Sequence, residues 1–235
     1  MGVRPHGGGW AQMSTQVVPR TPSKYRFALP NQIWVWKLRP PVFAVLAYLC
    51  WLHSHGDNRD VPDLGSLAMR LHMSLAMAEA SLGELLRRGL VTQDLTPILP
   101  RSGGRAGRFF TLPYEIFCLD LGHGAIAVYA YLLCCEDRRT HQCHPSYSTI
   151  SAATGLAINT VAKHIGKLAD QKFITVEHTS YVDDKGMKWN GNNCYTILPI
   201  QQAADGSYRR QLAELDLIAE RRRAASLLRG REGPA

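Results

Sequence analysis

This sequence of 235 residues has few long apolar runs and lacks a secretory leader and paired metal-ligand motifs. Its longest apolar run, residues 41–52, is too short to cross a bilayer. Residues 1–11 are rich in glycine and hold no apolar core of the kind that a signal peptide needs. The six cysteines, with Cys134 and Cys135 adjacent, do not have the spacing of a disulfide framework. These absences exclude membrane, fibrous and secreted classes and predict a reduced cytoplasmic protein.

Signatures of catalysis and of metal binding are missing as well. The chain has no Gly-x-x-x-x-Gly-Lys phosphate loop and no hydrolase nucleophile elbow. One cluster of possible zinc ligands contains Cys134, Cys135, His141, Cys143 and His144. Because it has no Cys-x-x-Cys pair, we expect buried thiols there instead of a zinc site. We therefore expect no enzyme activity, no cofactor and no metal.

Positive charge is present in excess, and its distribution is uneven. The chain has 27 basic and 19 acidic residues, a net charge of +8, which favours a polyanionic partner. Residues 1–26 carry four basic and no acidic residues, and residues 93–109 carry three and one. The tail, 201–235, carries seven and five. The excess thus lies in an arm, a loop and a tail, where solvated charge also accumulates.

An internal repeat is the strongest pattern in the chain. An offset of 83 residues aligns Phe27–Thr92 with Phe110–Thr175 without a gap, and 14 of the 66 pairs are identical, against about four expected by chance. The identities and the apolar exchanges cluster at positions with helical spacing. A chance best offset, or two unrelated copies of one common fold, are the alternatives to a true repeat.

Each repeat predicts the same order of elements. A Phe-x-Leu-Pro segment leads into a first helix, at 40–54 and 123–137, and Asp63 and Ser146 are suited to cap a second. After a three-residue turn comes a third helix, then an apolar strand (90–92; 173–176) and a returning strand (108–112; 194–198). Three helices with a two-stranded wing make a winged helix-turn-helix.

The predicted fold is therefore mainly α with small β wings, as two tandem winged helix-turn-helix domains related by the 83-residue repeat. We expect a flexible basic N-terminal arm at 1–26, winged-helix domains at 27–109 and 110–200, and a basic helical tail at 201–235. Within the tail, residues 208–228 predict a helix with an apolar side. That helix either packs on the two domains or pairs with another copy of the chain.

The second repeat resembles a known family. Its motifs are Phe110-x-Leu-Pro-x-x-Ile-Phe117, Ala127-Val-Tyr-Ala-Tyr-Leu132, Pro145-Ser-x-x-x-Ile150 and Gly155-Leu-Ala-x-x-Thr160-Val-x-x-x-Ile165-x-x-Leu168. Together they look like the N-terminal winged-helix module of RepA-type plasmid replication initiators and DnaD-like phage replisome organisers. The resemblance extends over about 110–200 and more faintly over 27–112. It implies binding of double-stranded DNA and a role in replication.

A recognition helix buries one side and turns the other to the major groove, where polar side chains bond bases and phosphates. In the second repeat the outward residues are expected to be Asn159, Thr160, Lys163, His164 and Lys167. The alternative is an ordinary solvated helix face. Five further candidates for DNA contact lie at the start of the second helix and in the wings. They are Ser146, Arg101, Arg105, Arg108 and Lys188. The arginines could instead belong to a flexible solvated loop.

The first repeat differs at the same helical positions. Its counterparts, Ala76, Met77, Ala80 and Glu84, make an apolar and acidic face that does not suit phosphate. Such a face suits a protein contact, most simply in a homodimer.

From these patterns we expect a sequence-specific DNA-binding protein, most simply a replication initiator or origin-binding protein of a bacterial plasmid, phage or integrative element. Replication proteins would then be further partners. The alternatives are a transcriptional regulator of a mobile element and, in another class, an interaction scaffold that has lost DNA binding.

Overall fold

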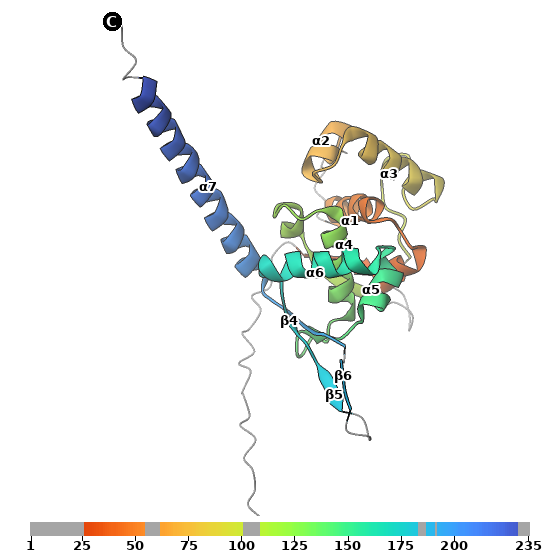
Figure 1. Ribbon diagram of the computed structural model, residues 1–235. Coiled ribbons are helices and arrows are strands. Elements are labelled where there is room, and N and C mark those ends of the chain that lie inside the picture. The colour runs from red at the N-terminus through yellow and green to blue at the C-terminus, as the bar shows by residue number, and fades with distance from the viewer. Residues whose placement is uncertain (1–25, 55–61, 101–108, 183–186, 191, 230–235) are drawn as a thin grey trace, which may run out of the picture.

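The computed structural model describes residues 26–54, 62–100, 109–182, 187–190 and 192–229. Its helices and strands alternate in two similar series followed by one long helix (Figure 1). The first series is β1 (Arg26–Pro30), the 3₁₀ helix η1 (Asn31–Trp36), α1 (Pro40–Ser54), α2 (Leu64–Arg70) and α3 (Leu75–Arg87). The second is β2 (Phe109–Pro113), η2 (Tyr114–Phe117), α4 (His123–Cys135), β3 (Gln142–Cys143), α5 (Tyr147–Thr154), α6 (Ile158–Asp170), β4 (Ile174–Glu177), β5 (Ser180–Val182), β6 (Lys188–Asn190) and β7 (Cys194–Ile197). The long helix is α7 (Ile200–Arg229).

Two apolar helices form the centre of the molecule. Every residue from Val42 to Trp51 of α1 is buried, and so is every residue from Ala125 to Ala130 of α4. A helix that is apolar on all sides can be stable only where other elements surround it. Accordingly, α1 packs on α3 and α4, and α4 packs on α6, so α3 and α6 flank the central pair (Figure 1). One hydrophobic core thus runs through both predicted domains.

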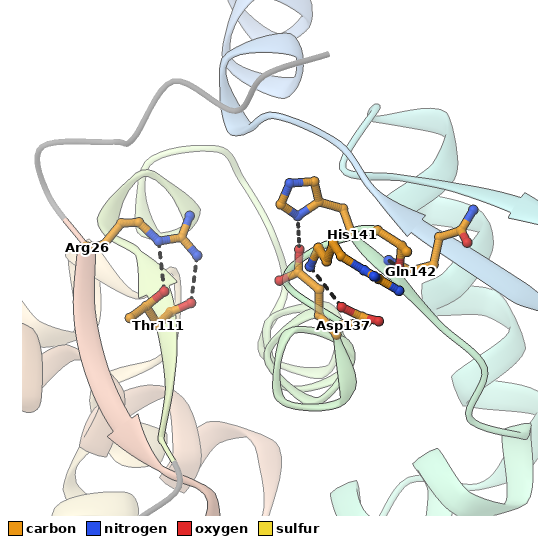
Figure 2. Close-up of polar contacts among 8 residues, drawn as sticks. Arg26, Thr111, Asp137, His141 and Gln142 are labelled. Atoms are coloured by element: carbon orange, nitrogen blue, oxygen red, sulfur yellow. Dashed lines mark hydrogen bonds and ion pairs between the residues drawn. The ribbon is translucent and has the colours of Figure 1, made fainter. Parts of the chain in front are cut away.

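The two Phe-x-Leu-Pro segments pair with each other. β1 and β2 are antiparallel, with Phe27 opposite Leu112 and Leu29 opposite Phe110. Figure 2 shows the Arg26 side chain reaching across to Thr111, where its guanidinium donates to the hydroxyl at 3.0 Å and to the carbonyl oxygen at 2.8 Å. The predicted border between residues 109 and 110 falls within β2.

This pairing corrects the predicted first wing. The returning strand at 108–112 was expected to pair with residues 90–92, but β2 pairs with β1 instead. Residues 90–92 instead pair with residues 96–98, through an isolated bridge between Val91 and Pro97 and backbone bonds from Thr92 to Thr96 and from Ile98 to Leu90. Across this pair Leu112 and Phe110 lie opposite the buried side chains of Phe27 and Leu29.

The second wing agrees with the prediction. β4 and β7 are antiparallel, with Ile174 opposite Ile197, and β3 adds a third strand on the other edge of β7. Beyond them β5 and β6 pair with each other and extend the wing away from the helices (Figure 1). A tight turn before β3 holds it in place: the backbone N–H of Asp137 donates to the Gln142 carbonyl, and His141 bonds the Glu136 carboxylate at 2.8 Å (Figure 2).

Left-handed backbone recurs at the spacing of the repeat. Positive φ angles occur at Lys37, His72 and Gly89, and 83 residues later at Asp120, Gly155 and Lys172. These positions follow the 3₁₀ helix, the second helix and the third helix of each series. The helix caps also correspond, because Asp63 and Ser146 each accept a bond from the backbone N–H three residues on, as predicted.

α7 is longer than the predicted tail helix and leaves the body of the molecule (Figure 1). Its N-terminal part buries Ile200, Ala203 and Ser207, whereas residues 208–218 are exposed. Among the described helices none combines the length and the apolar composition that crossing a membrane requires.

Candidate nucleic-acid interface

The α5–turn–α6 segment is fixed by local hydrogen bonds. The Thr154 hydroxyl donates to the Ile150 carbonyl at 2.8 Å, and Ser151 Oγ donates to the Leu156 carbonyl at 2.6 Å. Between them Gly155 ends α5 with φ of 70°, a left-handed conformation that glycine adopts without a steric cost. The turn therefore sets the angle at which α6 leaves α5.

α6 turns one side to the core and the other to solvent. Val161, Ile165 and Leu168 are buried, at the spacing of one helix face. On the opposite side Asn159, Lys163, Gly166 and Asp170 are exposed. The expectation that Asn159 and Lys163 point outward is confirmed as a matter of placement, and Thr160 lies half-buried beside them.

Ile158 is 50% exposed, although helical spacing places it on the same side of α6 as Val161 and Ile165. It is the first residue of α6, and a residue at the end of a helix projects beyond the neighbours that would cover it. The sequence signal was present, because the turn residues Gly155 to Ala157 place Ile158 at the tip. An exposed isoleucine there adds an apolar contact to the candidate face.

Lys167 does not point into solvent with Lys163. Its Nζ donates to the carbonyl oxygen of Asp120 at 3.1 Å, and Asp120 lies in the segment between η2 and α4. The helical position of residue 167 directs the side chain toward α4, one stripe away from the exposed face. Lys167 therefore lies outside the exposed face that Asn159 and Lys163 form, which corrects the expectation.

His164 is also turned toward α4. A β-carbon placed on Gly124 would lie 2.2 Å from His164 Nε2, so the imidazole rests against the bare backbone of Gly124. Burial there, together with the charges of Lys167 and Lys163, lowers the pKa of His164. A half-buried neutral ring is a packing element between α4 and α6, which corrects the expectation of an outward His164.

Ser146 serves chiefly as the cap of α5. Its hydroxyl accepts the backbone N–H of Thr149 at 3.1 Å and lies 2.8 Å from the hydroxyls of Ser148 and Thr149. The exposed hydroxyls at this end are those of Ser148 and Thr149, which the sequence analysis did not single out.

For the four remaining predicted DNA contacts, the structure gives at most the position of the backbone. Arg101, Arg105 and Arg108 lie outside the described residues. Lys188 begins β6, opposite Val182, so its backbone lies in the extended part of the wing.

The corresponding face of α3 is partly as predicted. Ala76, Met77 and Ala80 are exposed, Met77 by 40%. Glu84 is not part of that face, because it is only 7% exposed and forms ion pairs with Arg39 at 2.7 Å and Arg88 at 3.0 Å. Glu84 is the counterpart of Lys167, and both residues reach the segment before the first helix of their own series. Glu84, which was predicted to lie in a protein interface, thus forms ion pairs within its own series.

The cysteine cluster does not gather as a site. Cys143 is buried, Cys134 is half-buried and Cys135 is exposed, so burial was wrong for Cys135. Within the described residues no group of three or more His, Cys, Asp or Glu side chains is arranged to hold a metal ion.

Comparison with known proteins bears on the segment that contains α5 and α6. A family described as a helix-turn-helix domain matches residues 119–174. Those residues run from the end of η2 to the start of β4, and so include both helices and the turn between them. This part of the chain is similar to a helix-turn-helix domain. With β4 and β7 beside it, the segment has the arrangement of a winged helix.

Similarity to solved structures is more remote. A possible transcriptional regulator from Methanosarcina mazei Go1 is 18% identical, with 52% of this chain and 94% of that chain covered and a TM-score of 0.33. A Pi initiator protein in complex with iteron DNA is 11% identical, with 76% of this chain and 99% of that chain covered and a TM-score of 0.48. Among curated proteins none matches this chain.

Proposed function

We propose that the protein binds double-stranded DNA sequence-specifically and inserts α6 into the major groove. The observation that carries this proposal is the exposed face of α6 in a helix-turn-helix domain, with Asn159 and Lys163 one turn apart. Such a helix enters the groove with its N-terminal residues foremost. Ile158, Asn159 and Lys163 lie in the first two turns of α6, where base edges are within reach.

Each of these side chains suits a particular contact. Asn159 is suited to a bidentate bond with adenine, and Lys163 to guanine or to a phosphate. Ile158 offers an apolar surface for the methyl group of thymine. Ser148 and Thr149 at the start of α5 supply hydroxyls for the phosphate backbone, which sets register without selecting sequence. The proposed role is binding without catalysis, cofactor or metal.

Within DNA binding, we favour a replication initiator or origin-binding protein of a plasmid, phage or integrative element. This choice rests on the motifs of the second repeat, such as Phe110-x-Leu-Pro and Thr160-Val-x-x-x-Ile165. A transcriptional regulator is the second candidate, because the helix-turn-helix domain by itself serves either role. Repeated short sites inside an origin would favour initiation, and a single palindrome over a promoter would favour regulation.

We further propose that the two series are copies of one winged-helix unit. The support is the recurrence of left-handed backbone at Lys37, His72 and Gly89 and again 83 residues later, beside the matching caps. In the first copy the exposed face of α3, with Ala76, Met77 and Ala80, contacts protein rather than DNA. It lacks the amide and ammonium groups that α6 presents at the same positions.

The test of DNA binding starts from a pool of random duplexes, from which the full-length chain should select a defined site. Asn159→Ala and Lys163→Ala should each weaken binding to that site by about 1–3 kcal/mol, as expected for a direct base contact. Ala80→Ser on α3 is the matched control and should change affinity little. All three variants alter exposed side chains, so they should fold normally.

Salt dependence separates DNA binding from the scaffold alternative. A protein that neutralises several phosphates loses affinity steeply as salt rises. Weak binding that selects no site and is insensitive to salt would refute the proposal and favour a scaffold. Equal losses from Ala80→Ser and Lys163→Ala would show instead that both third helices read DNA.

A further inference from the structure

α7 presents an apolar stripe that nothing in the described part of the chain covers. Tyr208 is 63% exposed, Leu212 43% and Leu215 61%, and Ala219 follows one turn later. At 3.6 residues per turn these four side chains fall within an arc of about 60°. Their spacing of four, three and four residues is that of a coiled-coil seam.

We propose that α7 pairs with α7 of a second copy of this chain, in antiparallel orientation. When Leu212 lies level with the partner's Leu215, Tyr208 lies level with the partner's Ala219. The largest side chain of the stripe then faces the smallest one. Because the pair is twofold symmetric, each contact occurs twice, and the two leucine layers stand at the centre.

Charge complementarity fixes this register. The same alignment places Asp205 level with the partner's Arg222, so an ion pair closes the seam at each end. Arg209 borders the seam and comes close to the partner's Asp216, again twice. All four charged residues are exposed within the single chain, so each can meet a partner from another copy. A parallel pair would instead place Asp205 level with the partner's Asp205 in the seam and would lose these contacts.

The length of α7 suits the antiparallel arrangement. The helix has 30 residues and is about 45 Å long. The centre of the apolar stripe lies between residues 213 and 214, and the centre of α7 lies between residues 214 and 215. Each helix therefore overlaps the other along nearly its whole length, and its C-terminal end reaches the place where the partner's α7 leaves the body.

The first experiment measures self-association of the full-length chain by sedimentation velocity over a concentration series. Wild type should be a dimer, and Leu215→Glu should weaken the dimer about 100-fold or more, because two leucines are lost from the seam. Leu217→Glu is the matched control, since Leu217 is 47% exposed on the opposite side of α7. It should leave the dimer intact. Circular dichroism should give the same helix content for all three proteins.

The second experiment tests orientation and register. Arg209→Asp or Asp216→Arg alone should weaken the dimer about tenfold, because each puts like charges opposite one another twice. Mixing the two variants should restore dimers that contain one chain of each, since every contact then joins opposite charges. Failure of the mixture to associate would overturn the antiparallel register.

Three other outcomes would overturn the proposal. They are a wild-type chain that stays monomeric at its highest soluble concentration, equal effects of Leu215→Glu and Leu217→Glu, and dissociation by Met77→Lys with Ala80→Glu but not by Leu215→Glu. The last result would assign the dimer to the exposed face of α3.

Discussion

Replacing Gly124 with alanine should displace the DNA-reading helix without touching any residue that reads DNA. Gly124 lies in the first turn of α4, and the imidazole of His164 from α6 rests on its backbone. A β-carbon at Gly124 would lie 2.2 Å from Nε2 and 2.9 Å from two ring carbons. Since an ordinary contact begins near 3.4 Å, the ring must move by about 1.2 Å, the difference between 3.4 and 2.2.

The energetic cost follows from this displacement. Forcing an extra carbon into a packed contact costs about 1–3 kcal/mol, whereas glycine to alanine in a helix gains up to about 1 kcal/mol. Gly124→Ala should therefore lower the free energy of unfolding by about 0–3 kcal/mol. In a His164→Ala background the clash is absent and only the gain remains. The two substitutions should couple by about 1–3 kcal/mol.

Urea denaturation of the wild type, both single variants and the double variant measures this coupling. Gly166→Ala is a control on α6 itself, because a β-carbon there meets nothing within 4 Å. It should stabilise the protein slightly. Affinity for the selected DNA site should fall in Gly124→Ala and recover at least partly in the double variant. Additive effects of Gly124→Ala and His164→Ala would refute the idea that this contact sets the position of α6.

The other predictions concern pH, backbone strain and the arginine loop. The pKa of His164 is lowered in the folded chain, so its contribution to the free energy of unfolding is complete above the unfolded value of 6.5 and declines as the pH falls below it. His164→Gln should therefore make the free energy of unfolding fall less between neutral and acidic pH. Urea titrations at several pH values measure this difference. His72→Gly should raise the free energy of unfolding by about 0.5–1 kcal/mol, because His72 has a strained φ of 50° at the position where the second series has Gly155. A loss of stability would show that the contacts of the His72 side chain outweigh this backbone strain. Three arginines, Arg101, Arg105 and Arg108, lie between residues 100 and 109. Replacing all three with alanine should lower DNA affinity for all sequences alike and make the affinity less dependent on salt. An unchanged salt dependence would mean that these arginines are solvated and do not contact phosphates.

The sequence was sufficient to predict the helices of both series and the caps of α2 and α5. Asp63 and Ser146 start the second helices because a short polar side chain satisfies a free N–H there. Apolar spacing located α1, α4 and the third helices, and Gly155 located the turn. These features depend on interactions within a few residues, which is why they can be predicted locally.

Contacts between the two series could not be predicted in this way. The partner of β2 was assigned by analogy with an isolated winged helix, in which the returning strand pairs within its own unit. In the structure, β1 lies closer to β2 than residues 90–92 do, and the pairing Phe27–Leu112 joins residues 85 positions apart. Strand partners depend on which apolar surfaces meet in three dimensions, and the periodicity of a single segment does not contain that information.

The third helices show how much of the candidate site a helical wheel can define. It separated Val161, Ile165 and Leu168 from Asn159 and Lys163, because these lie on opposite sides of α6. It misassigned His164 and Lys167, which lie on the border between the sides. Whether a border residue faces solvent depends on the neighbouring helix, here on Gly124 and Asp120.

The residues on the border between the buried and exposed sides do not account for the difference between α3 and α6. The opposite charges of Glu84 and Lys167 do not distinguish two binding surfaces, because each side chain is bound within its own series, to Arg39 and Arg88 or to the Asp120 carbonyl. The exposed contrast is confined to Ala76, Met77 and Ala80 against Asn159, Thr160 and Lys163. Three small or apolar side chains replace an amide, a hydroxyl and an ammonium on otherwise matching helices. The proposed division between a DNA-reading helix and a protein-contacting helix thus depends on these three pairs.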